Sequence, residues 1–241
     1  MSVNTDQIQA YIFDMDGVIT DTATLHKEAW EAMFNLFLQD YPDSEKFNEK
    51  DYYLYLNGIP RHEGIKNFLR SRNITIPEGE KDDSAETRSI HGLGRLKNDL
   101  FKSILQHKPV KVFDDALEFL ETLKEKGTPT ALISASKNAE RLIKNAGITG
   151  LFDVIADGNL LEEKHLNGKP EPDIFHYAAK ELSIAPENVA IVEDARAGIK
   201  AGKKGGFGLI IALERENAQE SLSNTGADVV IENLRELQIE L

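Results

Sequence analysis

Two aspartates, Asp14 and Asp16, stand one residue apart after a short apolar run, and Gly17 follows them directly. A carboxylate can attack phosphorus and form an acyl phosphate, which divides one difficult group transfer into two easier steps. A second carboxyl group nearby can give a proton to the departing oxygen or take one from the arriving hydroxyl. The pair therefore predicts a phosphoryl-transfer centre with Asp14 as nucleophile and Asp16 as general acid and base.

Four other residues could complete such a centre, namely Ser134, Lys169, Glu193 and Asp194. Mg²⁺ prefers hard oxygen ligands, so we expect it to be held by Asp14 and Asp16 together with the negative charge of Glu193 and Asp194. Lys169 can offset the charge of the transferring phosphoryl group, and the Ser134 hydroxyl can donate a hydrogen bond to it. The expected cofactor is Mg²⁺.

Each of these residues also has an ordinary structural explanation. Ser134 and Asp194 could be helix N-caps, and Lys169 could be a solvated surface lysine. The DMDG segment could be a turn or a calcium loop, although a calcium loop has its glycine at the sixth position and an acid at the twelfth, where this chain has Leu25. The site interpretation rests on all of them falling where one edge of a sheet is expected.

The elements that would position these residues are short apolar runs separated by helical patterns. The runs cover residues 10–13, 130–133, 189–192 and 208–212, with a shorter one at 228–231. Strands that alternate with helices form a parallel sheet covered on both faces. Ligands of such sheets gather at the carboxyl ends of the strands, where the polar residues named above follow the runs.

The alternation is interrupted after the first run. For roughly 85 residues the pattern is helical and contains no convincing buried strand, with helices expected over 23–38, 61–72 and 94–107 and a polar loop over 75–83. We therefore expect an α/β fold in which residues 1–21 and 108–241 form a Rossmann-like parallel-sheet core. Residues 22–107 are expected to form a helical domain inserted after the first strand.

Composition excludes several classes of function. The chain has 241 residues and no cysteine, which excludes disulfides, thiolate catalysis and zinc–thiolate sites. Its net charge of −13 argues against general affinity for nucleic acid or anionic membranes. No run approaches the roughly 20 apolar residues of a membrane span, and the first ten residues have no secretory pattern. We expect a cytoplasmic protein, with monomer as the default state.

Four motifs together resemble the haloacid dehalogenase-like superfamily of phosphotransferases, and within it the β-phosphoglucomutase-like family. The segments that carry the resemblance are FDMDGVITDTATLHKEAW, SASKN, GKPEPDIF and VEDARAGIKA. The resemblance implies a Rossmann-like core with a helical cap. It also implies phosphorylation of Asp14 and a magnesium site made by the Asp14 carboxylate, the Asp16 backbone carbonyl and Asp194, with Glu193 close by.

The same resemblance assigns roles to residues that their spacing alone does not single out. Ser136, Lys137 and Asn138 match positions that bind a second, non-transferring phosphate, and Arg61 matches a cap arginine with the same role. His26 and Lys97, with Asn98, match cap residues linked to closure and substrate contact. The chain departs from the family pattern at Asn57 and Pro60, in an acidic loop over 78–86, in an insertion over 157–168 and at 195–196.

Three functions remain open from the sequence. The resemblance implies a mutase that interconverts β-D-glucose 1-phosphate and glucose 6-phosphate through an aspartyl phosphate and a bisphosphate. A Mg²⁺-dependent sugar-phosphate phosphatase would use the same Asp14 and Asp16, with water as the acceptor in place of a sugar hydroxyl. A non-catalytic binding module is the third, and the presence of Asp14, Asp16, Lys169 and Asp194 argues against it.

Overall fold

The computed structural model describes residues 7–215 and 221–237, and in it the chain divides into two units. Unit 1 comprises Met1–Asp21 and Lys111–Leu241, and unit 2 comprises the intervening segment Thr22–Val110. The chain leaves unit 1 after its first strand and returns before its second, so unit 2 is an insertion in the sequence of unit 1.

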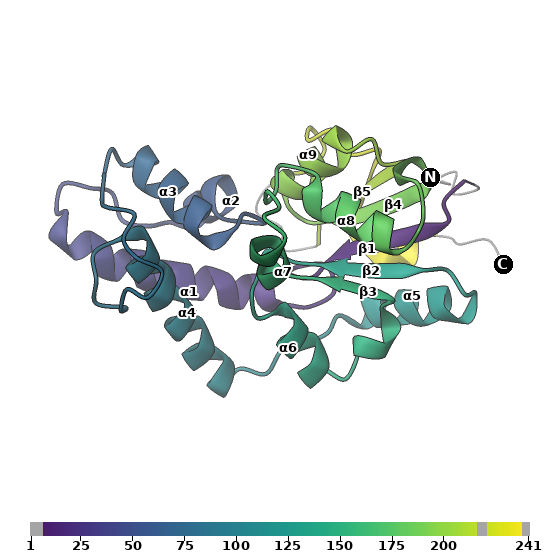
Figure 1. Cartoon of the computed structure of the whole chain (residues 1–241), viewed down its shortest axis with the longest axis horizontal. Helices are drawn as coiled ribbons and strands as arrows, with labels where there is room; N and C mark the ends of the chain where they lie inside the picture. Colours follow the sequence, from purple (N-terminus) through teal and green to yellow (C-terminus); the bar gives the residue numbers. More distant parts are fainter. Residues whose placement is uncertain (1–6, 216–220, 238–241) are drawn as a thin grey trace. The chain divides into compact units, whose positions relative to one another are not determined.

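Unit 1 is built on a six-stranded sheet with the order β3-β2-β1-β4-β5-β6, in which each pair of neighbours is parallel (Figure 1). The strands are β1 (Ala10–Asp14), β2 (Thr130–Ile133), β3 (Val154–Ala156), β4 (Val189–Glu193), β5 (Leu209–Leu213) and β6 (Val229–Ile231). Their apolar runs are nearly continuous because helices cover both faces of a parallel sheet. The predicted α/β fold with a Rossmann-like parallel sheet is confirmed.

The two faces of β1 show how the helices cover the sheet. Ala10 and Ile12 belong to a core cluster that also contains Phe175 of α8. Tyr11 and Phe13 point to the other face, where both rings pack edge-on against Phe119 of α5. Figure 1 shows α8 and α9 on one side of the sheet and α5 on the other. The helices of unit 1 are α5 (Asp114–Glu125), α6 (Ala139–Asn145), α7 (Gly158–Glu163), α8 (Asp173–Glu181) and α9 (Arg196–Lys204).

One strand was missing from the sequence prediction. β3 has three residues, two of which are only partly buried, so its hydrophobic pattern is too short to separate from a loop. It pairs with the outer side of β2 and places α7 after it. α7 lies in the segment that the sequence identified as an insertion.

Unit 2 is helical throughout its regular elements and has its own apolar core. Its helices are α1 (Thr22–Phe37), α2 (Glu49–Tyr55), α3 (Arg61–Ser71) and α4 (Ile90–His107), with a 3-10 turn at Leu38–Asp40. Phe34 of α1 packs on Phe68 of α3 with ring centroids 3.9 Å apart. α2 was not predicted, and α4 begins earlier than expected because the Ser89 side chain caps it by accepting from the Gly92 N–H.

No helix in residues 7–215 and 221–237 combines the length and the apolar character needed to cross a bilayer.

Candidate active site

The register of the sheet brings several predicted residues to one edge of unit 1. Asp14 is the last residue of β1 and pairs with Ile133, so Ser134 follows immediately beside it. Phe13 pairs with Val192, which places Glu193 next to Asp14 on the other side. β1 is central, and the chain continues from it first toward β3 and later toward β6. A site at this switch point is typical of open parallel sheets.

Lys169 joins two of these strand ends. Its Nζ donates to Asp14 Oδ1 at 2.5 Å and forms a second ion pair with Glu193 Oε1. All three side chains are buried, with relative exposures of 4%, 3% and 0% for Asp14, Lys169 and Glu193. Buried charges of this kind persist only when they are paired, which excludes the surface-lysine explanation of Lys169.

Burial dominates the electrostatics of the acidic groups. It raises the pKa of Asp14 to about 8, with Lys169 opposing the shift and Glu193 and Asp16 adding to it. Burial also raises the pKa of Glu193, and it raises that of Asp194 well above its usual range with help from Asp14 and Glu193. Burial disfavours the charged form of Lys169, but Asp14 and Glu193 outweigh this effect and raise its pKa. Lys169 therefore offsets only part of the effect of burial on the pKa values of these carboxyl groups.

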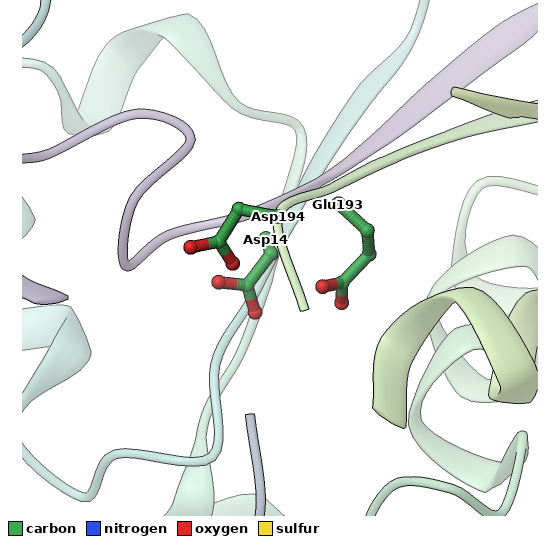
Figure 2. Close-up of side chains that lie close together, drawn as sticks. All are labelled: Asp14, Glu193 and Asp194. Atoms are coloured by element: carbon green, nitrogen blue, oxygen red, sulfur yellow. The ribbon is translucent and has the colours of Figure 1, made fainter. Parts of the chain in front are cut away.

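The acidic residues fit a divalent cation. Asp14, Glu193 and Asp194 each place a carboxylate oxygen within 4.8 Å of the others. Figure 2 shows the three side chains close together. Hard carboxylate oxygens are the ligands that Mg²⁺ prefers, and a bound cation reverses the pKa shifts that burial causes. Within the cluster, Asp14 and Glu193 are buried and both pair with Lys169, whereas Asp194 is only partly buried. Asp194 is therefore the member of the cluster most open to a cation from solvent.

The close approach of Asp194 to the β1 loop depends on a glycine. Gly17 has φ +89°, a left-handed conformation, and a Cβ added there would lie 2.1 Å from Asp194 Oδ2. Gly198 has a similar relation to Glu193, because an added Cβ would lie 2.0 Å from Glu193 Oε1. Sequence reasoning missed both glycines as site residues. The available signal was a glycine close in sequence to each acidic motif.

Asp16 is connected to Asp14 and to Ser134 by hydrogen bonds. The Asp16 backbone N–H donates to Asp14 Oδ2 at 2.9 Å, and Asp16 Oδ2 accepts from the Ser134 hydroxyl at 3.0 Å. Ser134 Oγ in turn accepts from the Ser136 N–H at 3.0 Å. Ser134 is fully buried and does not directly precede a helix, so it is not a helix N-cap. Its two hydrogen bonds connect Asp16 to the loop after β2.

The loop after β2 carries the predicted phosphate-binding segment. The Asn138 N–H donates to Ser136 Oγ at 3.2 Å, and the Gly158 N–H donates to the Ser136 carbonyl at 3.3 Å. Lys137 is exposed and forms an ion pair with Glu162 of α7. Exposed pairs of this kind contribute only about 0–1 kcal/mol, so the Lys137 ammonium remains available to an anion.

Unit 2 holds three of the predicted residues, His26, Arg61 and Lys97: His26 and Lys97 contact each other, and Arg61 binds two acceptors on α4. Lys97 is 2% exposed and contacts His26 Nδ1, with its Nζ 5.0 Å from the Trp30 ring centroid and 4.7 Å from that of Phe101. Arg61 donates to the Gly94 carbonyl at 3.2 Å and to Asn98 Oδ1 at 3.1 Å.

Burial lowers the pKa of Arg61 to about 10, against the opposing effect of Asp99. A guanidinium with that pKa is still charged at neutral pH. The structure thus brings His26 and Lys97 into contact, and two acceptors on α4 hold the charged side chain of Arg61, the first residue of α3.

The chain is similar to known proteins over most of its length, both in sequence and in fold. A family of hydrolases, the haloacid dehalogenase-like hydrolases, matches residues 8–206. The chain is 38% identical to a β-phosphoglucomutase of Mycobacterium bovis over 96% of this chain and 92% of the relative. It is 27% identical to a phosphorylated carbohydrates phosphatase of Thermotoga maritima over 93% and 94% of the two chains. The crystal structure of a β-phosphoglucomutase from Clostridium difficile superposes with a TM-score of 0.76 at 28% identity, covering 96% of this chain and 94% of that one.

Proposed function

We propose that this chain, which belongs to the haloacid dehalogenase-like superfamily and within it to the β-phosphoglucomutase-like family, is a phosphotransferase that converts a hexose 1-phosphate to the 6-phosphate. The favoured substrate is β-D-glucose 1-phosphate, with an aspartyl phosphate and a hexose bisphosphate as intermediates. The observation that carries the proposal is the buried Asp14 carboxylate, which contacts Lys169 and lies beside Glu193 and Asp194 at the carboxyl ends of β1 and β4.

Asp14 is the nucleophile in this proposal. One of its carboxylate oxygens bonds to phosphorus while the bond between phosphorus and the sugar oxygen breaks, which leaves an acyl phosphate on Asp14. Lys169 Nζ, 2.5 Å from Asp14 Oδ1, offsets the negative charge that gathers around the transferring group. Since Glu193 also pairs with Lys169, it keeps the ammonium in place and charged.

Asp16 moves the proton. As an acid it protonates the departing sugar oxygen, and as a base it removes the proton from the hydroxyl that attacks the aspartyl phosphate. The Ser134 hydroxyl donates to Asp16 Oδ2 at 3.0 Å, so the same serine can orient Asp16 or, when a phosphoryl group is bound, donate to one of its oxygens. Asp16 lies only two residues from Asp14, and its N–H already donates to the nucleophile's other oxygen.

Magnesium is the proposed cofactor. The Asp14 and Asp194 carboxylates and the Asp16 backbone carbonyl would hold it. Glu193, which pairs with Lys169, would add negative charge close to the ion. When bound, Mg²⁺ neutralises phosphoryl oxygens and keeps Asp14 ionised at neutral pH. The raised pKa values of Asp14 and Asp194 in the protein alone support this role, because positive charge placed beside the two carboxyl groups would favour their ionised forms.

A mutase must also bind the phosphate that is not being transferred. We assign this role to Arg61 and to the loop residues Ser136, Lys137 and Asn138, and we assign substrate contact to His26 and Lys97. Arg61 is charged at neutral pH and held by two acceptors, and Lys137 has only a weak exposed partner. The bisphosphate must reverse its orientation, so that its C1 phosphate returns to Asp14 and hexose 6-phosphate remains.

One assay tests the reaction. Purified protein receives β-glucose 1-phosphate, Mg²⁺ and a trace of glucose 1,6-bisphosphate, and both glucose 6-phosphate and free phosphate are measured over time. We expect glucose 6-phosphate to accumulate and Asp14→Asn to abolish its formation. If neither product appears with any hexose phosphate and no aspartyl phosphate can be trapped, the protein is not a phosphotransferase.

A phosphatase is the second candidate, and the similarity to the Thermotoga maritima phosphatase over nearly the whole chain favours it. Asp14 and Asp16 would act in the same way, with water as the acceptor. The two functions differ in how well water is excluded while the aspartyl phosphate exists. Accumulation of free phosphate in place of glucose 6-phosphate in the assay above identifies the phosphatase.

A further inference from the structure

Arg215 contacts the loop of the nucleophile although it has no place in the mechanism above. It follows β5 by two residues, and its side chain reaches the loop after β1. Its Nε donates to the Gly17 carbonyl at 2.9 Å and its Nη2 donates to the Val18 carbonyl at 2.8 Å. One guanidinium therefore binds two consecutive carbonyls of the turn that follows β1, almost 200 residues away in sequence.

The turn that Arg215 holds carries two groups of the proposed site. Asp16 lies in this turn directly before Gly17, and Gly17 is the residue against which the Asp194 carboxylate packs. The turn has its own hydrogen bonds, from the Gly17 N–H to the Thr20 carbonyl at 2.8 Å and from the Ile19 N–H to the Met15 carbonyl at 3.0 Å. None of these bonds uses the Gly17 or Val18 carbonyl, so Arg215 supplies the partners that the turn lacks.

The guanidinium is itself held from two other directions, and one of its partners is anchored in turn. Its Nη1 lies 3.1 Å from both carboxylate oxygens of Asp115, a residue that is 4% exposed at the start of α5. Asp115 Oδ2 also accepts from the Leu234 N–H at 2.9 Å, and the Arg215 Cζ lies 3.6 Å from the Phe113 ring centroid. Hydrogen bonds between charged groups are roughly twice as strong as neutral ones, so this anchor is rigid.

We propose that Arg215 is a positioning residue for phosphoryl transfer, which acts by fixing the turn that carries Asp16 and Gly17. This inference rests on the proposed function. The guanidinium is suited to the task because its planar fork reaches two carbonyls and one carboxylate at once. A lysine carries the same charge but has a single nitrogen and cannot make this set of bonds.

The test compares Arg215→Ala and Arg215→Lys with a matched control, Arg235→Ala. Arg235 also binds an acid on α5, Glu118, at 2.7 Å, but that pair is exposed and does not touch the turn. Three quantities are measured in the full chain with Mg²⁺ present: kcat and KM for the conversion of β-glucose 1-phosphate, the thermal midpoint, and hydrogen exchange of the peptide spanning residues 14–21.

We expect Arg215→Ala to lower kcat by about 10²-fold, the effect of a misplacement near 1 Å, with a smaller change in KM. Arg215→Lys should recover less than about a tenth of the loss, whereas a purely electrostatic role predicts nearly full recovery. The 14–21 peptide should exchange about tenfold faster in both variants and be unchanged in Arg235→Ala. Added guanidinium should restore part of the kcat of Arg215→Ala, since the Arg215 side chain is 20% exposed and its space opens to solvent.

The outcomes separate the possible errors. A folded Arg215→Ala protein that keeps kcat within threefold of the parent overturns the inference, as does a loss of kcat without faster exchange of the 14–21 peptide. If Arg215→Lys has the full kcat of the parent, the role of Arg215 is its charge and not the positioning of the turn. If the unaltered protein has no phosphotransferase activity, the proposed function fails, and the exchange data still show whether Arg215 fixes the turn.

Discussion

The substitution Gly17→Ala is a direct test of the Asp194 position. A Cβ at residue 17 would lie 2.1 Å from Asp194 Oδ2 and 2.7 Å from its Cγ, whereas real Cβ atoms essentially never approach another atom within 3.0 Å. The Asp194 carboxylate must therefore move by roughly 1 Å. Because Asp194 is a proposed magnesium ligand, a displacement of that size near the reacting atoms is expected to cost about 10²-fold in kcat.

The same substitution also strains the backbone. Gly17 has φ +89°, and a side chain in the left-handed region costs roughly 1–2 kcal/mol. For a chain of this size, each kcal/mol lowers the thermal midpoint by roughly 2–4 °C. A fall in the midpoint alone would therefore not distinguish backbone strain from a displaced carboxylate.

Gly127→Ala provides the control for strain. Gly127 has φ +68° and follows α5, and a Cβ added there meets no atom within 4 Å. This variant should lose similar stability and keep full activity. Its comparison with Gly17→Ala isolates the effect of moving Asp194.

The assay follows glucose 6-phosphate formation at several Mg²⁺ concentrations, with thermal unfolding of the same samples. We expect Gly17→Ala to need more Mg²⁺ for half-maximal rate and to retain a lower kcat at saturation, while Gly127→Ala behaves as the parent does. Equal activity of the two variants would refute the reasoning, because it would mean that Asp194 can move without consequence.

Three further predictions concern the proposed chemistry. Asp16→Asn should slow phosphoryl transfer by about 10²–10⁴ while leaving Mg²⁺ binding intact, as measured by single-turnover kinetics and calorimetry. Arg61→Ala should impair the mutase reaction far more than the hydrolysis of acetyl phosphate, and equal losses in both assays would exclude a second-phosphate role. In metal-free protein, Asp14 binds a proton more tightly when folded, with a pKa of about 8 against 3.8. Its contribution to the free energy of unfolding should therefore fall as pH rises from 4 to 8. Urea unfolding in EDTA at several pH values should show this decrease for the parent protein. The decrease should be absent in Asp14→Asn, and it should also be absent when the parent is measured in saturating Mg²⁺ without EDTA.

Much of the fold could be predicted from the sequence because apolar runs and helical patterns are local properties of the chain. The runs at 130–133 and 189–192 correspond to β2 and β4, and the long helical segment corresponds to the helices of unit 2. β3 escaped prediction because three residues carry too little pattern, and α2 because its seven residues have only two buried positions.

The sequence by itself determined which side chains stand at strand ends, since a parallel sheet sends every such end to the same edge. Tertiary structure alone decided how these side chains pair. Lys169 contacts Asp14 from 155 residues away, Ser134 binds Asp16 from 118 residues away, and Arg215 reaches Gly17 from a distant strand. Such contacts depend on distances of a few ångströms across folded segments. Residue type and local spacing do not encode those distances, and only the packing of the sheet and its loops sets them.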